Sequence, residues 1–227
     1  MTMQKHQKQY VQRAVFTRKG ALSYIGHLDL MRTFERAIRR AELPILYSQG
    51  YNPRPMMVFA LPLGVGIHTE GDVVDVPMSV PVDPDEFISK VNAELPVDLK
   101  ILSSISIPEP KDSLMSIVAA ADYRIEANGI GTVASKILDF EEVITTKKSK
   151  GKIITVDIRD LILDVNRIDD DSIVLKVAAG SSKNLRPDVF MNALCSSVNY
   201  DKESALDATV TRTALYCNCE GKLVGIV

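Results

Sequence analysis

Arginine is concentrated in one short stretch of the sequence. Between residues 13 and 54, eight cationic side chains oppose only three acidic ones, a local charge of +5 in a chain whose net charge is -2. Four of them follow one another at spacings of four, three and one: Arg32, Arg36, Arg39 and Arg40. Guanidinium binds phosphate and carboxylate through paired hydrogen bonds, so this cluster indicates a localised anionic partner. A solvated helix face is the alternative interpretation.

A loop rich in turn-forming and hydrogen-bonding residues comes directly afterwards, at residues 47–55. Tyrosines beside a cation are typical of surfaces that stack on the bases of single-stranded nucleic acid. The loop could equally be a compact one whose tyrosines pack internally. The candidate binding residues in it are Tyr47, Ser48, Gln49, Gly50, Tyr51, Asn52 and Arg54.

Catalytic and metal-binding candidates are few. His27 and Asp29 could perform acid–base chemistry, although residues at the start of a helix more often cap it. Cys217 and Cys219 supply two thiols, too few for a zinc or iron–sulfur site unless another chain contributes. Serine-triad, zincin and Rossmann motifs are absent, so we expect no metal site and no cofactor.

The elements that must position these residues follow from hydrophobic periodicity. Residues 27–42 predict a helix with an apolar stripe on one side and the four arginines on the other, and Pro44 stops it. The first half of the chain then predicts the order β-α-β-β-α-β, with strands at 10–18, 57–61, 73–80 and 97–104 and a second helix at 84–94.

The second half predicts the same order again. Strands are expected at 123–127, 153–158, 173–178 and 208–216, helices at 133–142 and 187–194, and a charged turn at 147–152. Both second helices open with Pro-Asp, at residues 84–85 and 187–188. We therefore predict an α+β protein of two tandem ferredoxin-like modules, residues 10–106 and 121–227, joined by a linker at 107–120.

Composition limits the location of the protein. The N-terminal residues carry no apolar signal segment, and no apolar run approaches the roughly 18 residues that span a bilayer. Three cysteines do not indicate a secreted disulfide framework. We expect a cytoplasmic protein without a membrane partner.

The first module also carries a family resemblance. Residues 23–66, SYIGHLDLMRTFERAIRRAELPILYSQGYNPRPMMVFALPLGVG, resemble the bacterial radical-SAM-linked protein family, a domain of unknown function found beside or fused to radical SAM proteins. The resemblance extends through VDIRDLI (156–162), LRPDVF (185–190) and TRTALY (211–216). Gly26 stands where that family usually has serine, Tyr51 where it has phenylalanine, and Asp72 where glutamate is common. The chain lacks a CxxxCxxC cluster motif, so the resemblance implies a radical SAM partner on a separate chain.

Three functions are compatible with these features. The leading hypothesis is a non-catalytic RNA-binding or substrate-presenting accessory protein for a radical SAM enzyme. The second is an adaptor whose arginine face docks on that enzyme without RNA. The third is a ribonuclease-like enzyme that uses His27, oriented by Asp29.

Overall fold

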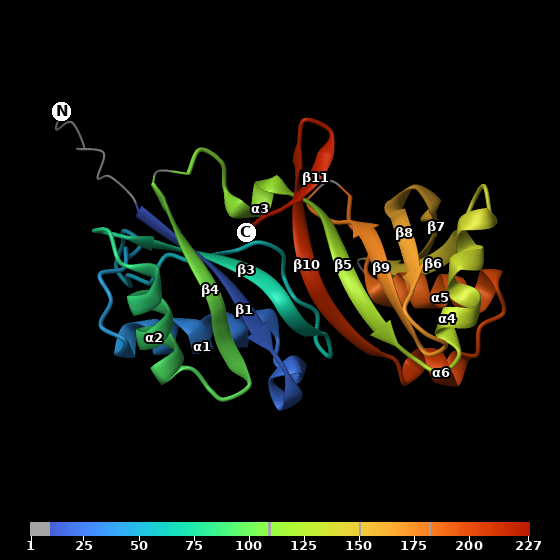
Figure 1. Ribbon diagram of the computed structural model, residues 1–227, viewed down its shortest axis with the longest axis horizontal. Helices are drawn as coiled ribbons and strands as arrows, with labels where there is room; N and C mark the ends of the chain where they lie inside the picture. Colours follow the sequence, from blue (N-terminus) through green and yellow to red (C-terminus); the bar gives the residue numbers. More distant parts are fainter. Residues whose placement is uncertain (1–9, 109, 150, 182) are drawn as a thin grey trace. The chain divides into compact units, whose positions relative to one another are not determined.

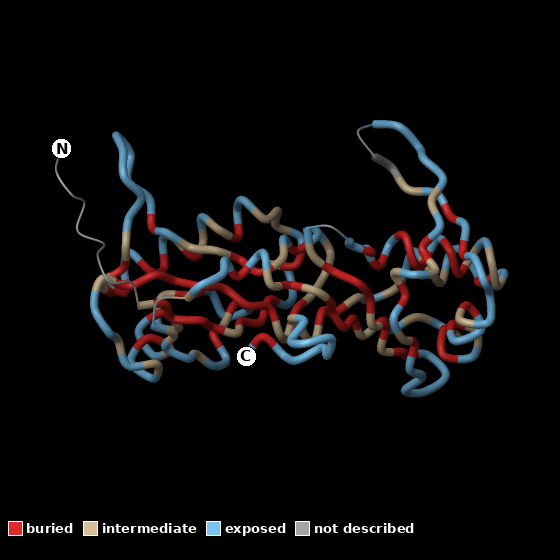
Figure 2. Tube along the Cα trace, turned by 90° about the horizontal axis from the view of Figure 1, so that it is seen from above, coloured by how far each residue is buried: buried red, intermediate tan, exposed pale blue. Residues whose placement is uncertain are grey.

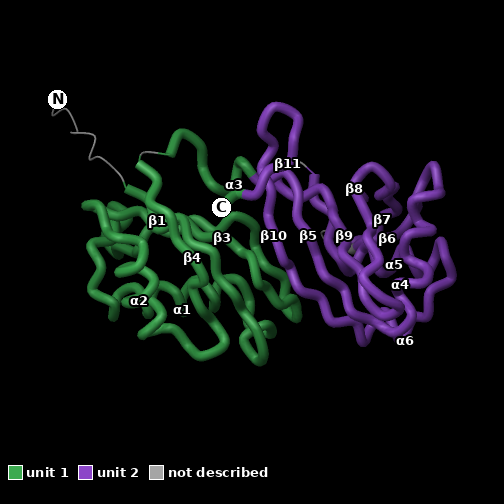
Figure 3. The backbone as a smooth tube through the Cα atoms, in the orientation of Figure 1, with its two compact units in different colours: residues 1–117, 226–227 green, residues 118–225 purple. Residues whose placement is uncertain are grey.

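The chain forms two compact units. The computed structural model describes residues 10–108, 110–149, 151–181 and 183–227 (Figure 1). One unit contains residues 1–117 and 226–227, and the other contains residues 118–225 (Figure 3). The division falls inside the predicted linker 107–120, of which residue 109 lies outside the described residues. Strands extend into both ends of the predicted linker. The segment between these strands is therefore shorter than the sequence predicts.

The first unit has the predicted order of elements. They are β1 (Tyr10–Arg18), the 3-10 helix η1 (Gly20–Tyr24), α1 (His27–Arg40), β2 (Val58–Phe59), β3 (His68–Met78), α2 (Pro84–Glu94), β4 (Leu99–Pro108) and α3 (Leu114–Ile117). The strands form an antiparallel sheet in the order β4-β1-β3-β2. The predicted bounds of β1 and α2 are confirmed, whereas β2 keeps only two of its five predicted residues and β3 begins five residues early.

Both long helices of this unit pack on one face of its sheet (Figure 1). Alternate residues of β1 and β3 meet the apolar stripe of α1, which is Leu30, Phe34, Ala37 and Ile38. The rings of Phe16, Phe34 and Phe59 pack edge to face with centroids 5.2 to 5.8 Å apart. Burying each such side chain stabilises the fold by about 1.5 to 3 kcal/mol, so α1 is held by this stripe and its opposite side faces solvent.

Helix α1 ends two residues earlier than predicted. Its last helical residue is Arg40, and Ala41 donates its backbone N–H to the carbonyl of Ala37. Glu42 then adopts a left-handed conformation with φ of 52°. Helices often end on a residue in this region, where glycine is favoured because it has no Cβ. Pro44 follows, as the sequence predicts.

The second unit contains two sets of paired strands. Its elements are β5 (Val118–Glu126), α4 (Ile130–Val133), η2 (Ala134–Asp139), β6 (Ile144–Ser149), β7 (Lys152–Asp157), η3 (Arg159–Leu161), β8 (Ile162–Arg167), β9 (Ser172–Ala178), α5 (Pro187–Ser197), α6 (Lys202–Leu206), β10 (Thr209–Cys219) and β11 (Lys222–Gly225). An antiparallel sheet runs β10-β5-β9-β8, with β11 on the other edge of β10. Strands β6 and β7 form a separate hairpin.

Three sequence predictions for this unit were wrong. The strand predicted at 153–158 lies in β7 of the separate hairpin, and the second strand of the main sheet is β8, which the sequence analysis missed. The helix predicted at 133–142 is divided into α4 and the 3-10 helix η2. The charged turn predicted at 147–152 is mostly strand, and residue 150 lies outside the described residues. The strand errors arose because pairing between segments, which local patterning does not reveal, decides where a strand lies.

Buried residues follow the strands of each sheet, and exposed residues concentrate in the connecting loops (Figure 2). No helix in the described part of the chain is long and apolar enough to cross a membrane.

Candidate functional site

Two of the four arginines on α1 are held by acidic partners. The Nη1 atom of Arg32 donates to Asp29 Oδ1 at 2.9 Å, one helical turn away. Arg40 donates through Nε to the Glu94 carboxylate and through Nη2 to the Glu94 backbone carbonyl, each at 2.6 Å. The second contact joins α1 to α2 and uses both sides of the guanidinium fork. Arg40 is therefore a structural residue as well as a surface charge.

The other two arginines are available. Arg36 and Arg39 are exposed, and neither has an ion pair or side-chain hydrogen bond within the described part of the chain. Their guanidinium groups project from the side of α1 opposite its buried stripe. Two neighbouring unpaired cations attract an anion more strongly than the paired arginines on the same helix.

The predicted basic region is much smaller in the structure than in the sequence. Arg13 is buried and donates two hydrogen bonds, at 2.8 and 2.9 Å, to the buried carboxylate of Asp75. Lys19 pairs with Glu70 at 3.0 Å. Arg18 is buried too. Of the eight cations between residues 13 and 54, only Arg36, Arg39 and Arg54 are exposed without an ion pair among the described residues.

Arg18 has a structural role that the sequence analysis missed. Its guanidinium donates to the backbone carbonyls of Ile25 at 3.3 Å, Gly64 at 2.8 Å and Ile67 at 2.6 Å. It therefore fixes the segment that enters α1 against the loop that enters β3. A signal was present, because Ala14, Phe16 and Arg18 alternate along β1 and the first two face the core.

The entrance to α1 is not capped by the residues that the sequence indicates. Gly26 occupies the N-cap position and provides no side-chain hydrogen bond, and His27 is the first helical residue. The His27 imidazole packs edge-on against Phe59, with ring centroids 5.3 Å apart. Asp29 lies in the first turn as predicted, but its carboxylate accepts a hydrogen bond from Arg32. The expectation that His27 or Asp29 caps the helix was therefore wrong.

The loop at residues 47–55, here called the arm, is closed at its base. Tyr47 and Pro55 form a β-bridge, and the Ser48 backbone N–H donates to the Arg54 carbonyl at 2.8 Å. In return the Arg54 N–H donates to Ser48 Oγ at 3.0 Å. Gly50 has a φ of +134°, a conformation that favours glycine and allows the tip to reverse. These contacts make the arm an ordered turn.

Side chains at the tip of the arm extend into solvent. All residues from 48 to 54 are exposed, and Tyr51 is fully exposed at 105%. Tyr47 is 39% exposed at the base. The alternative interpretation, in which the Tyr51 ring packs inside the loop, is therefore wrong. After α1 the backbone forms a β-bridge between Ile45 and Met78 of β3 and then enters the arm. Among the described residues, no hydrogen bond or ion pair joins the arm to Arg36 or Arg39.

A partly buried polar cluster in the second unit was also missed. Lys176 Nζ lies 2.8 Å from Asp122 Oδ1 and 3.7 Å from the centroid of the Tyr216 ring, and the Tyr216 hydroxyl donates to Asp122 Oδ2 at 2.7 Å. Burial disfavours the ammonium, but hydrogen bonds to Asp122 and Tyr216 outweigh it and raise the pKa of Lys176. Burial, reinforced by Asp122, raises the pKa of Tyr216. The three groups satisfy one another, so we interpret the cluster as structural.

In the part of the chain that the structure describes, the cysteines do not assemble a metal centre. The sulfur atoms of Cys217 and Cys219 are 3.8 Å apart on β10. Among the described residues, no group of three or more His, Cys, Asp or Glu side chains could hold a metal ion. Cys195 lies apart from them, and burial raises the pKa of its thiol.

Comparison with known proteins identifies a family. No curated protein matches the chain in sequence. Residues 12–187, which are 176 of the 227 residues, match a family described as uncharacterized protein conserved in bacteria, DUF2344. The matched region includes α1, the arm and most of the second unit's sheet. The chain belongs to the DUF2344 family of uncharacterized proteins conserved in bacteria.

Proposed function

We propose that the protein is a non-catalytic RNA-binding protein that holds a single-stranded RNA segment on α1 and the arm. The observation that carries this proposal is the exposure of Arg36, Arg39 and Arg54 without ion-pair partners in the described chain, together with the fully exposed ring of Tyr51. The arginines would neutralise phosphates, and the tyrosine would stack on an unpaired base.

The composition of this surface favours RNA over a folded protein partner. An ordered arm that presents an aromatic ring and an arginine to solvent matches the stacking and phosphate contacts of single-stranded nucleic acid. An adaptor would dock the same arginines on an acidic protein surface, but such docking gives the Tyr51 ring no specific role. The ribonuclease-like alternative is disfavoured because the Asp29 carboxylate is engaged by Arg32.

Radical SAM chemistry enters the proposal through the family resemblance alone. The chain would present its bound RNA to a radical SAM enzyme encoded separately, in the cytoplasm. Co-purification of such an enzyme with the full chain, retained after nuclease treatment, would support this part of the proposal. An RNA-binding chain that captures no such enzyme would restrict the function to RNA binding.

We also propose that each unit is a ferredoxin-like module. In both units the fourth main strand lies beside the first, the first beside the third, and the third beside the second. The order β-α-β-β-α-β supports the assignment directly in the first unit. In the second unit the β6–β7 hairpin would be an insertion before the second main strand. An experimentally determined structure with another strand order would refute the assignment.

A binding experiment tests the RNA proposal. A fluorescently labelled oligouridylate is titrated with the full chain at low salt, and binding is followed by anisotropy. Tyr51→Ala should weaken binding by about 5-fold to 100-fold, the range expected when one stacked base is lost, and Tyr51→Phe should retain it. Tyr24→Ala is the matched control, because Tyr24 is 71% exposed but precedes α1.

Two results would overturn the proposal. One is absence of RNA binding by the folded protein at low salt. The other is equal weakening by Tyr51→Ala and Tyr24→Ala, which would show that the arm is not the binding surface. If RNA does not bind but an acidic protein partner does, and Arg36→Glu abolishes its capture, the adaptor function replaces this one. RNA cleavage that is lost in His27→Ala would instead establish the enzyme.

A further inference from the structure

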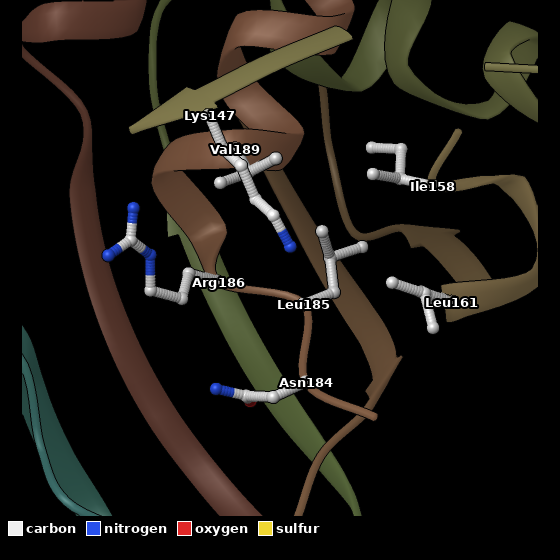
Figure 4. A pocket seen from close by; sticks show the side chains of 7 residues that line it. All are labelled: Lys147, Ile158, Leu161, Asn184, Leu185, Arg186 and Val189. Atoms are coloured by element: carbon white, nitrogen blue, oxygen red, sulfur yellow. The ribbon is translucent and has the colours of Figure 1, made fainter. Parts of the chain in front are cut away.

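The second unit contains a pocket that the RNA-binding surface does not use. Its volume is about 230 Å³, and it lies between the β6–β7 hairpin, the segment around η3, and the start of α5 (Figure 4). Four apolar side chains line it: Ile158, Leu161, Leu185 and Val189. Ile158, Leu185 and Val189 are themselves almost completely buried, so these apolar walls are fixed by the packing of the unit.

The polar side of the pocket has unused hydrogen-bonding capacity. Lys147 is half-buried on β6, and Figure 4 shows its ammonium directed into the pocket toward Leu185. Neither Lys147 nor the Asn184 carboxamide has an ion pair or side-chain hydrogen bond in the part of the chain that the structure describes. Both groups therefore keep hydrogen-bond donors that no group of the described chain accepts. An anion in the pocket would accept them.

Arg186 does not supply a second free charge. Its guanidinium points away from the other lining side chains in Figure 4 and donates to Asp188 Oδ2 at 2.8 Å. The pair is close to neutral, which leaves Lys147 as the uncompensated cation of the pocket. The charge balance therefore favours a ligand with a single anionic group.

We propose that this pocket binds a small organic anion, a compact apolar body that carries one carboxylate or phosphate group. The anionic group would accept hydrogen bonds from Lys147 Nζ and the Asn184 amide, and the apolar body would contact Leu161, the only apolar lining side chain that is not almost completely buried. Pockets for small molecules commonly combine apolar walls with a few convergent polar groups of this kind. The inference is independent of the proposed RNA-binding function, since it concerns other residues of another unit.

The experiment uses 1-anilinonaphthalene-8-sulfonate, an aromatic anion whose fluorescence rises in apolar surroundings, with the full-length folded chain. We expect saturable binding of one molecule per chain. Lys147→Met should weaken it by about 10-fold to 100-fold, the range for loss of a charge-assisted hydrogen bond, and Lys147→Arg should restore most of it. Lys152→Met is the matched control, because Lys152 is exposed on the same hairpin but does not line the pocket.

Competition then identifies the anionic group. Displacement by benzoate but not phenyl phosphate assigns a carboxylate ligand, and the reverse assigns a phosphate ligand. Equal binding by Lys147→Met and the unmodified protein, or equally tight binding of the neutral N-phenyl-1-naphthylamine, would overturn the proposal. Arg36→Ala/Arg39→Ala should leave this binding unchanged even where it abolishes RNA binding, so the two proposals fail separately. Circular dichroism of each variant establishes that it is folded.

Discussion

Replacing Arg36 and Arg39 by alanine should reduce the salt dependence of RNA binding more than it changes any other property of the protein. Both side chains are exposed, and in the described chain neither has an ion pair, so their removal leaves no buried group without a partner. Alanine is also the strongest helix former, and α1 should retain its length. The stability of the double variant should therefore match that of the unmodified protein.

The size of the salt dependence follows from the number of exposed arginines that have no ion pair among the described residues. If Arg36, Arg39 and Arg54 each neutralise one phosphate, the logarithm of the association constant should fall with the logarithm of salt concentration with a slope of about -2.1. Between about 50 mM and about 200 mM salt, affinity should then decrease about 18-fold. The double variant keeps Arg54 alone, so its slope should be about -0.7 and its loss about threefold over the same range.

Anisotropy titrations of a labelled oligouridylate at four or more salt concentrations measure both slopes. Arg40→Gln is the matched control, because it removes one charge from the same helix but its guanidinium is already engaged by Glu94. That variant should bind with the slope of the unmodified protein. The reasoning is refuted if Arg40→Gln lowers the slope as much as a single Arg36→Ala, or if the double variant leaves the slope unchanged.

Three further predictions concern the framework of the site. Glu42→Gly should stabilise the protein by roughly 0.5 to 1 kcal/mol, because Glu42 has a φ of 52°, whereas Glu42→Ala should not; thermal unfolding of the two variants distinguishes them. Arg13→Met should destabilise by about 3 to 5 kcal/mol in urea unfolding by leaving the Asp75 carboxylate buried alone, and a compensating Asp75→Leu should recover most of the loss. The pKa of Asp157 is lowered, chiefly by the backbone N–H of Arg159, so its contribution to folding is present above pH of about 3.8 and is lost as pH falls through its folded pKa. Asp157→Asn should therefore flatten the pH dependence of the unfolding free energy below about pH 4.

Local sequence signals were sufficient to predict the order of elements in the first unit, although not every boundary. Helix α2 has the predicted bounds because its signals are contained within it: Asp83 accepts hydrogen bonds from the backbone N–H groups of Asp85 and Glu86, and Pro84 fits the first turn. The second unit depended on pairing between distant segments. Residues 153–158 alternate like a sheet strand, but a turn near Gly151 pairs them with β6 instead. The second main strand, β8, was hidden by its short and partly exposed pattern.

The arginine-bearing side of α1 could be predicted from the sequence, but the number of its arginines that lack an acidic partner could not. The spacing of the arginines placed them on one side of α1, and the structure agrees. Which arginines are free depends on carboxylates that spacing does not reveal, since Glu94 lies 54 residues from Arg40 and Asp75 lies 62 residues from Arg13. Spacing on the same helix offers only Asp29 and Glu35 as partners, and the structure pairs Asp29 with Arg32.

If the chain binds RNA as proposed, a surface whose three exposed arginines have no ion pair among the described residues also limits how a sequence could be selected. Phosphate contacts do not distinguish sequences, and stacking on Tyr51 tolerates every base. Selectivity must therefore come from polar side chains of the arm that can reach base edges. Ser48 Oγ already accepts the Arg54 N–H, whereas the carboxamides of Gln49 and Asn52 are exposed and make no hydrogen bond within the described residues. If the arm prefers one sequence, alanine at Gln49 or Asn52 should abolish that preference while leaving the salt slope intact, because neither carries the charge that releases counterions.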